Sequence, residues 1–233
     1  MDVTAAISSI NYALRGTDED APSEGTDEWN YWLFFLNLKK NELYRDTEKN
    51  WPESHTTQSI GTVAAATSPS LEIPSNFLAP SGDGDGVGAY VVASGQRIDL
   101  DLVKPEEKRQ DKRRVYIDGV NPRVLRFCDE LTADDAIVGG TLYLPGYYLP
   151  ADFENAGDTL TFPDNNWAVV STAAEIAFND VTYEDKAEGL NARANNLYRM
   201  MVSNSLSSYA GKSRKLRTNV ISGARAIRGL RRS

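Results

Sequence analysis

The residues from Asp27 to Asp46 constrain the fold more than any other part of the chain. Thr26 can cap this stretch as a helix, acidic residues fall in its first turn, and Arg45 falls in its last turn. Between residues 29 and 38 only two asparagines are neither apolar nor aromatic. A helix that is apolar on all sides must be covered on all sides, and this run is too short to span a bilayer. We therefore expect a core helix.

Two separate faces of this helix are apolar, because large side chains recur on it at helical spacing. The first face consists of Trp29, Trp32, Leu33 and Leu36. The second face, which we call the aromatic patch, consists of Tyr31, Phe34, Phe35 and Leu38. Other helices of the chain can cover one of these faces, which leaves the aromatic patch in need of a further partner.

Three more helices and a β-rich middle segment complete the expected elements. Helical spacing of apolar residues predicts helices over residues 2–15, 164–180 and 183–206. From about residue 56 to 162 this spacing is lost, and short runs rich in Val, Ile, Thr and Tyr alternate with turn residues. The candidate strands are Ser59–Ala65, Ala89–Ala93, Gln96–Val103, Arg114–Ile117, Arg123–Phe127, Thr141–Tyr143 and Thr159–Phe162. No long helix lies between them, so we expect an antiparallel sheet.

The expected fold class is therefore α+β, with a helical bundle built from both chain ends. Residues 1–55 and 163–208 would form this bundle, and residues 56–162 would form an antiparallel β insertion. Residues 209–233 would form a basic C-terminal extension. One segment of the insertion, Tyr143–Pro150, is rich in Tyr and Pro. It fits either an exposed recognition loop or a β corner packed on the bundle.

Charge is distributed unevenly along the chain. Residues 189–233 hold ten basic residues and no Asp or Glu, whereas residues 1–188 hold 15 basic and 33 acidic residues. An acidic body disfavours general nucleic-acid binding, because it repels phosphates. A basic tail indicates a partner. Ile221, Ile227 and Leu230 distinguish it from a purely solubilising tail, which is the alternative interpretation.

The sequence offers little for catalysis. His55 is the only histidine and Cys128 the only cysteine, so a nucleophile–histidine pair would have to use them, and no zinc-ligand set exists. Asp129 and Glu130 follow Cys128 and oppose formation of its thiolate. We therefore expect no enzyme, no catalytic residues and no cofactor. A single cysteine also fits a reducing compartment.

A glycine-rich segment at residues 81–88 is the one candidate for a metal loop. Asp83 and Asp85 match the first two ligand positions of a calcium-binding loop, but Val87 stands at the third. We interpret the segment as a flexible loop and expect no metal. The N-terminus has no basic leader followed by an apolar run, and no segment is apolar for long enough to span a membrane.

The helical parts of the sequence resemble the head-to-tail adaptor (connector) proteins of tailed bacteriophages, the group that includes tail tubular protein A. The resemblance begins with Ile10–Arg15 and continues in the helix at Trp32–Leu43. It is also carried by Leu160–Trp167, which leads into an alanine-rich helix. It ends with Tyr183–Lys186 and Ala194–Met201 in the last predicted helix. The β insertion is not part of it.

This resemblance implies a structural virion protein of the phage neck, assembled in the host cytoplasm. Its subunits would form a ring, often a dodecamer, that joins the portal to the tail or nozzle proteins and extends the DNA channel. The helical part would form the ring wall, with the aromatic patch as the candidate subunit contact. The C-terminal extension would reach the portal through Lys212, Arg214, Lys215, Arg217, Ile221, Arg225, Ile227, Arg228, Leu230, Arg231 and Arg232. The family has no catalytic residues.

Two other functions remain open from the sequence. The first is a different ring-forming component of a phage tail or baseplate. The second is a carbohydrate- or nucleic-acid-binding module that uses the Tyr-rich segment and the basic tail. The acidic body would suit a channel through which DNA slides without sticking, so the adaptor remains the expectation that explains most of the sequence.

Overall fold

The computed structural model describes residues 1–204 except residues 18, 47–50, 82–86, 108 and 121. The chain divides into two compact units. The helical unit contains Met1–Lys40 and the chain from Phe153 onward, and the β unit contains Asn41–Asp152. The predicted C-terminal extension and the centre of the glycine-rich loop lie outside the described residues.

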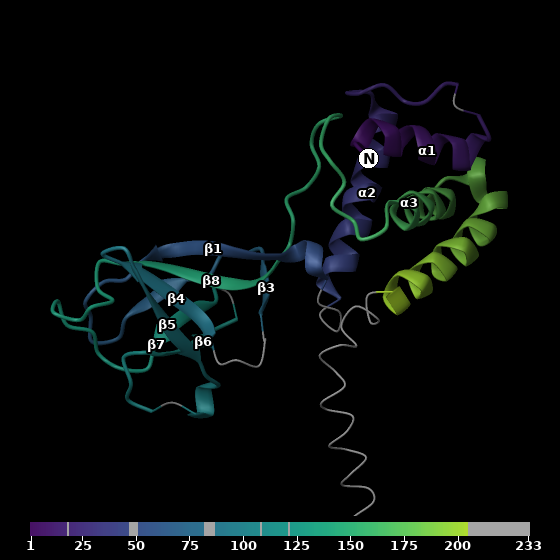
Figure 1. Cartoon of the computed structure of the whole chain (residues 1–233). Coiled ribbons are helices and arrows are strands. Elements are labelled where there is room, and N and C mark those ends of the chain that lie inside the picture. Colours follow the sequence, from purple (N-terminus) through teal and green to yellow (C-terminus); the bar gives the residue numbers. More distant parts are fainter. Residues whose placement is uncertain (18, 47–50, 82–86, 108, 121, 205–233) are drawn as a thin grey trace, which may run out of the picture. The chain divides into compact units, whose positions relative to one another are not determined.

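The helical unit contains the four predicted helices except for the end of α2, residues 41–45, which belongs to the β unit (Figure 1). They are α1 (Val3–Arg15), α2 (Asp27–Arg45), α3 (Asn165–Asn179) and a helix whose described part covers residues 184–204. The sidechain of Asp2 accepts a hydrogen bond from the backbone N–H of Ala5 at the start of α1, and Gly16 ends this helix with a positive φ of 76°. Thr26 caps α2, since its Oγ1 accepts from the N–H of Trp29 at 3.2 Å.

The last helix begins differently from the prediction. In the sequence, Thr182 followed by Asp185 resembles a capping box and predicts that Thr182 caps this helix. Instead, a short 3₁₀ turn, η3 (Val181–Tyr183), comes first, and the carboxylate of Asp180 accepts from the N–H of Thr182 at 2.9 Å. Asp180 precedes the whole turn and is the better acceptor, because a carboxylate is more effective there than a hydroxyl.

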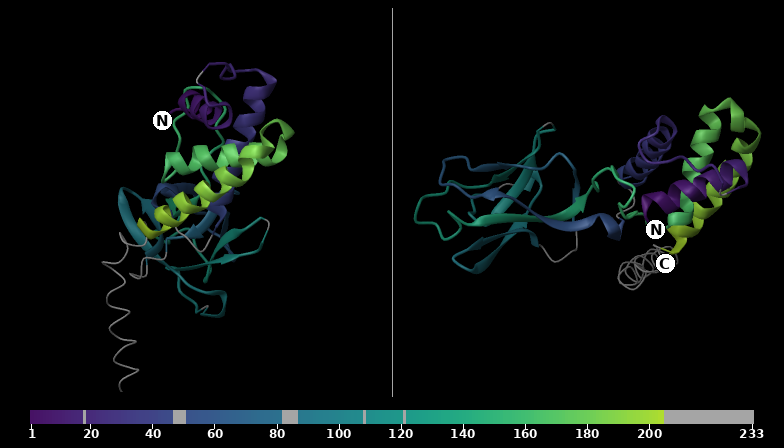
Figure 2. Two further views of the ribbon diagram at one scale, coloured as in Figure 1. Left: turned by 90° about the vertical axis from the view of Figure 1, so that its right-hand side faces the viewer. Right: turned by 90° about the horizontal axis from the view of Figure 1, so that it is seen from above.

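Apolar stripes on the helices form the core of the helical unit. α1 buries Val3, Ile7, Ile10 and Leu14 and packs on α3, which is buried along most of its length. The helix 184–204 returns along α3, so that the rings of Trp167 and Tyr198 lie 6.0 Å apart (Figure 2). The first face of α2 is buried as predicted, because its four residues are all among the core side chains.

Asn37 of α2 holds the returning chain through two hydrogen bonds. The amide of Asn37 donates to the carbonyl oxygen of Phe153 at 2.9 Å and accepts from the N–H of Phe153 at 2.8 Å. Lys40 is fully buried, with its Nζ 3.3 Å from Asn37 Oδ1 and 4.7 Å from the centre of the Phe153 ring. This double contact fixes where the chain enters the second half of the helical unit.

Thr159–Phe162 was predicted as a strand of the insertion, and this prediction is wrong. Only Thr159 forms a bridge, with Asp2, and the N–H of Leu160 donates to the carbonyl oxygen of Met1 at 3.0 Å. The segment therefore pairs with the N-terminus inside the helical unit. Its alternating apolar residues are buried there, which produces the same pattern as a strand.

The β unit is one mostly antiparallel sheet. Its strands are β1 (His55–Thr62), β2 (Ser70–Glu72), β3 (Phe77–Pro80), β4 (Val87–Ala93), β5 (Gln96–Leu102), β6 (Arg114–Asp118), β7 (Val124–Phe127) and β8 (Thr141–Tyr148). Short 3₁₀ turns η1 (Pro52–Ser54) and η2 (Pro105–Glu107) precede β1 and β6. The hydrogen-bonded order is β1-β8-β4-β5-β6-β7-β2, and β3 lies off this path and pairs with the end of β8 (Figure 1).

The sheet was expected to be antiparallel, and one pair of strands departs from this expectation. The sheet is also nearly closed. β5 and β6 run parallel, because the chain between them, which contains η2, crosses back before β6 begins. The two ends of the order approach each other: a Cβ atom at Gly61 on β1 would lie 3.0 Å from Leu71 Cδ2 on β2. A nearly closed sheet encloses its own core, here formed by side chains such as Val91, Leu100 and Leu142.

The Tyr-rich segment is neither an exposed loop nor a corner. β8 extends to Tyr148, and its side chains alternate between half-buried and buried along the whole strand. Leu142, Leu144 and Tyr148 point into the sheet core, whereas Tyr143 and Pro145 lie on the other face. The Oη of Tyr148 donates to the carbonyl oxygen of Leu144 at 2.6 Å, and burial raises the pKa of Tyr148 to about 12.

Candidate assembly site on the helical unit

The aromatic patch of α2 forms one connected cluster of rings. Tyr31 and Phe35 meet edge to face with their centres 4.9 Å apart, and Phe34 meets Phe35 at 5.3 Å. Phe35 is only 7% exposed, whereas Tyr31 is 38% and Phe34 is 61% exposed. Leu38, one turn further along, is half-buried. A buried phenylalanine therefore holds two accessible aromatic rings in place.

A second apolar surface lies where α3 ends, and the sequence did not predict it. We call Phe178, at the end of α3, and Val181, in η3, the apolar corner. Phe178 is 60% and Val181 86% exposed. The backbone between them is ordered, since the N–H of Asp180 donates to the carbonyl oxygen of Ile176 at 2.9 Å and Asp180 caps Thr182. This corner displays its two side chains on a fixed turn.

The sequence contains a signal for the apolar corner. Trp167, Val170, Ala174 and Ala177 define the buried stripe of α3, and all four are buried in the structure. Phe178 follows Ala177 and falls outside that stripe, and Val181 follows the end of the helix. A large apolar residue outside the buried stripe is a candidate for an interaction surface.

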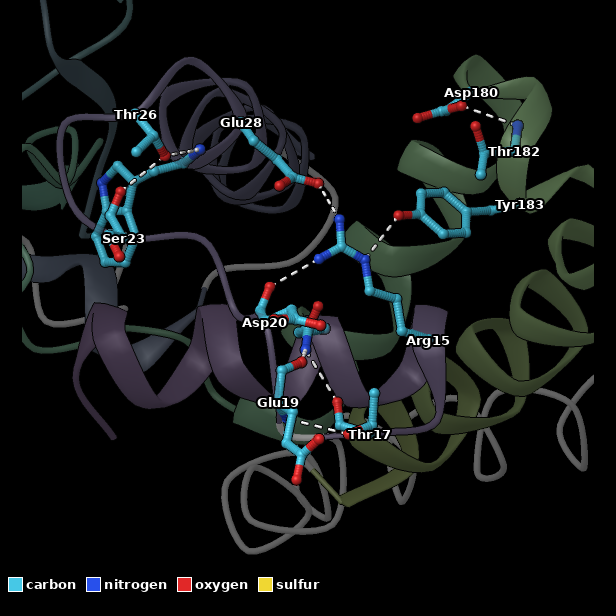
Figure 3. Close-up of polar contacts among 12 residues, drawn as sticks. Arg15, Thr17, Glu19, Asp20, Ser23, Thr26, Glu28, Asp180, Thr182 and Tyr183 are labelled. Carbon is cyan, nitrogen blue, oxygen red and sulfur yellow. Dashed lines mark hydrogen bonds and ion pairs between the residues drawn. The ribbon is translucent and has the colours of Figure 1, made fainter.

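Arg15 connects the elements that carry these two surfaces (Figure 3). Its Nε donates to Tyr183 Oη in η3 at 2.9 Å, and its Nη1 donates to the carbonyl oxygen of Asp20 at 2.7 Å. Its Nη2 forms an ion pair with Glu28 in the first turn of α2. The guanidinium also lies over the ring of Trp32, 5.5 Å from its centre. We call this set of contacts the Arg15 clamp.

The Arg15 clamp is charged and supported by neighbouring contacts. Burial opposes the positive charge, but the hydrogen bond to Tyr183 and the charge of Glu28 outweigh it and raise the pKa of Arg15. Lys186 Nζ donates to the carbonyl oxygen of Leu14, next to the clamp. The amide of Asn11 donates to the carbonyl oxygens of Thr17 and Glu19 at 2.9 and 3.0 Å. The end of α1, the chain after it, α2 and η3 are thus tied together.

The other predicted site residues lie elsewhere. The predicted portal-binding residues, from Lys212 to Arg232, fall outside the described residues. His55 is exposed at the start of β1, with its ring 5.3 Å from that of Tyr147. Cys128 is half-buried just after β7. These two residues stand on separate strand ends, and the structure does not bring them together as a pair.

Among the described residues, no group of three or more His, Cys, Asp or Glu side chains could hold a metal ion. In the same part of the chain, every helix is too short or too polar to cross a membrane. One small pocket of the β unit lies beside β2 and is lined by Val63, Ser68, Leu71 and Phe127, among others, with no ionisable side chain in its lining.

The chain matches no protein-family model, and no curated protein sequence matches it. The geometry of the aromatic patch, the apolar corner and the Arg15 clamp therefore carries the functional argument.

Proposed function

We propose that this protein is a head-to-tail adaptor of a tailed bacteriophage, a structural protein whose subunits form a ring between the portal and the tail. One observation carries the proposal. The stretches that resemble the adaptor family lie far apart in the sequence, yet they contact one another in the helical unit. Arg15 binds Tyr183, Lys186 binds the carbonyl group of Leu14, and Trp167 meets Tyr198. The stretches that carry the resemblance therefore pack together in the helical part of the chain.

Assembly is the proposed mechanism. Subunit contacts would bury the aromatic patch, since exposed aromatic rings on a fixed support are typical of protein interfaces. The basic C-terminal extension, with Lys212, Arg217 and Arg232 among its cations, would order on binding the portal, which costs conformational entropy at that moment. The acidic body would let DNA pass through the ring without specific binding. No residue is proposed as catalytic.

The test is direct observation of the assembly. Purified protein is examined by negative-stain electron microscopy and mass photometry, alone and mixed with the portal protein of its phage. We expect closed rings that dock coaxially on the portal. A protein that remains monomeric at all concentrations and does not bind the portal would contradict the proposal. A ring-forming tail or baseplate component remains the alternative, and the position of the ring in purified particles separates the two.

A deletion tests the role of the extension. Removal of Gly211 to Ser233 takes away eight basic residues and no acidic ones. We expect the shortened protein to keep its circular dichroism spectrum and its ability to form rings, but to lose docking on the portal. Normal docking of the shortened rings in the same electron-microscopy assay would show that the portal contact lies elsewhere.

The β unit supports a second candidate function, binding of an uncharged carbohydrate. The rings of Tyr90 and Tyr143 stack at 5.1 Å, and Arg97 lies 4.0 Å from the centre of Tyr90. Asp99 pairs with Arg97 at 2.6 Å, so the surface holds aromatic rings and polar groups without excess charge. Titration of the protein with neutral oligosaccharides, followed by NMR, tests this candidate. The absence of shifts that depend on Tyr143 would exclude it.

A further inference from the structure

We propose that Asp118 and Gly119, at the turn that follows β6, are a site of spontaneous covalent modification, at which Asp118 is converted to isoaspartate. The reaction needs only these two residues and water, so the inference does not depend on the proposed function. Asp118 is the last residue of β6, and Gly119 follows it with a positive φ of 78°. Among the described residues, this is the only place where Asp or Asn precedes Gly.

The backbone nitrogen of Gly119 lies beside the carboxyl group that it would attack. Its N–H donates to Asp118 Oδ1 at 2.9 Å, and the carbon under attack, Cγ, is bonded to that oxygen. Reacting atoms that are already held side by side lose little entropy on reaching the transition state. Gly119 has no side chain to shield its nitrogen, and both residues are exposed, so water reaches the site.

The reaction balances with water as the only other reactant. The carboxylate of Asp118 first takes a proton from solvent. The nitrogen of Gly119 then forms a bond to Cγ, and one carboxyl oxygen leaves as water together with the amide proton, which gives a cyclic succinimide. Water reopens this ring at either carbonyl carbon. Opening at Cγ restores aspartate, whereas opening at the main-chain carbonyl carbon gives isoaspartate, whose main chain is one carbon longer.

Arg126, on β7, opposes this reaction. Its Nε lies 2.9 Å from Asp118 Oδ2, while the N–H of Gly119 holds Oδ1. A hydrogen bond to a carboxylate oxygen lies close to the plane of the group, whereas the nitrogen must approach Cγ from above that plane. The carboxylate therefore has to rotate before it reacts, and the ion pair with Arg126 resists this rotation. Loss of the ion pair should speed up the reaction.

Asp129 makes the same local contact as Asp118 but lacks the glycine. It accepts from the N–H of the next residue, Glu130, at 2.9 Å, but the side chain of Glu130 crowds that nitrogen. The turn after β6 cannot exchange its glycine without strain, because a Cβ atom at Gly119 would lie 2.7 Å from the carbonyl oxygen of Pro122. The fold thus retains the residue that makes Asp118 reactive.

The modification would weaken one side of the sheet. Asp118 pairs with Val124 at the end of β6, and β2 pairs with β7 on its other side. One more carbon in the main chain at Asp118 shifts the register of this pair. We expect isomerised protein, separated by ion-exchange chromatography, to melt at a lower temperature than the unmodified protein. Equal melting temperatures would overturn this consequence.

The main experiment follows isoaspartate in the intact protein during several weeks at physiological temperature and neutral pH. Trypsin releases residues 115–123 as one peptide in which Asp118 is the only aspartate, and electron-transfer mass spectrometry distinguishes isoaspartate from aspartate. We expect isoaspartate to accumulate at Asp118 and not at Asp129, which a second protease brings into the same measurement. No isoaspartate at Asp118, or equal amounts at both residues, would overturn the proposal.

Variants of Asp118 test the ring closure. Asp118→Asn closes the same ring with loss of ammonia, so every event changes the mass of the peptide, and we expect conversion several-fold faster than in the wild type. Asp118→Glu cannot form this ring and should give no isomer. A stable asparagine in Asp118→Asn would show that the turn forbids ring closure and would overturn the proposal.

A variant of Arg126 tests its opposing role. Arg126→Gln should raise the rate of isoaspartate formation several-fold, with an unchanged circular dichroism spectrum. Arg97→Gln is the matched control, because it removes an ion pair with Asp99 in the same unit, and it should leave the rate at Asp118 unchanged. The same rate in Arg126→Gln and in the wild type would overturn the role of Arg126 and leave the modification site itself standing on the first measurement.

Discussion

At the scale of the residue, Phe34 and Phe35 show how neighbours in the sequence take different roles. Phe35 packs into the helical unit and contacts two rings, whereas Phe34 projects from it. Burial is worth about 1.5–3 kcal/mol for a phenylalanine side chain, and only Phe35 gains it within one subunit. Phe35 therefore stabilises the subunit, whereas Phe34 is exposed and is proposed to serve assembly.

Alanine substitution of each phenylalanine tests this separation. Phe35→Ala should lower the free energy of unfolding by about 3–5 kcal/mol, because it leaves a cavity in the core. Phe34→Ala should change it by about 0.5 kcal/mol or less, because it affects an exposed side chain. Chemical denaturation of the monomeric protein measures both values. Equal losses would mean that Phe34 is also part of the core.

The raised pKa of Tyr148 predicts a loss of stability at alkaline pH. Burial raises its pKa to about 12, above its ordinary value of 10.0, so the folded protein favours the neutral hydroxyl. The resulting stabilisation is complete below pH 10 and is lost as the pH rises towards 12. Between pH 9 and 11.5 the free energy of unfolding of the β unit should fall more steeply in the wild type than in Tyr148→Phe. If urea denaturation gave the same dependence of the unfolding free energy on pH for both proteins, this prediction would be contradicted.

At the scale of the element, β8 organises the β unit. It pairs with β1 along one edge and with β4 and β3 along the other, so three strands depend on its register. Close packing at Gly146 is one requirement of this register. A Cβ atom there would lie 2.6 Å from the carbonyl oxygen of Ala79 and 2.6 Å from the ring of Phe77. Only glycine fits between these two groups.

Gly146→Ala should therefore destabilise the β unit by about 1–3 kcal/mol, because the new methyl group forces neighbouring backbone to move. Gly157→Ala is the control, since no atom lies within 4 Å of the position that its Cβ would take. Thermal denaturation of both variants gives the comparison. An unchanged melting temperature in Gly146→Ala would show that β3 can shift without cost.

The sequence predicted the helices better than the strands, for physical reasons. Helical spacing repeats over several turns in α1 and α3, and each carries its own capping residue. β2 and β3 are short and flanked by prolines, so they have no pattern of their own and exist only because β7 and β8 pair with them. Pro145 and Gly146 suggested a loop, but packing against Phe77 and Ala79 outweighs their turn preference.

Only one part of the candidate site, the aromatic patch, could be predicted from the sequence. The aromatic patch follows from two apolar faces on one helix, and the structure brings its four residues together on α2. The apolar corner and the Arg15 clamp were missed, because Arg15 looks like a favourable charge at the end of α1 when only the sequence is known. Its contact with Tyr183 joins residues 168 positions apart, which no local pattern contains.

At the scale of the whole molecule, the chain forms two units from three segments. Among the described residues, those that form or pack against the hydrophobic core of the β unit lie between positions 60 and 148, so this core uses none from the helical unit. Asn41 Nδ2 lies 3.5 Å from Asp152 Oδ1, so the two ends of the β unit are close together. Both features are typical of an inserted domain.

Residues 41–152 produced alone should therefore fold. We expect a cooperative unfolding transition and a dispersed NMR spectrum that match those of the β unit in the intact protein. The complementary change, a short Gly-Ser linker in place of residues 41–152, should leave the helical unit folded. A disordered spectrum of the isolated β unit would mean that it depends on the helices for its stability.

The packing of α1 on α3 has a consequence for biosynthesis. α1 and α2 leave the ribosome first, but α3, on which α1 packs, follows more than a hundred residues later. At roughly 5–20 residues per second, the N-terminal helices wait on the order of ten seconds for their partner, while the β unit can already fold. During this interval Trp29, Trp32 and Leu36 have no cover from α3 or the last helix. The nascent chain should thus be a client for chaperones until its final third has been translated.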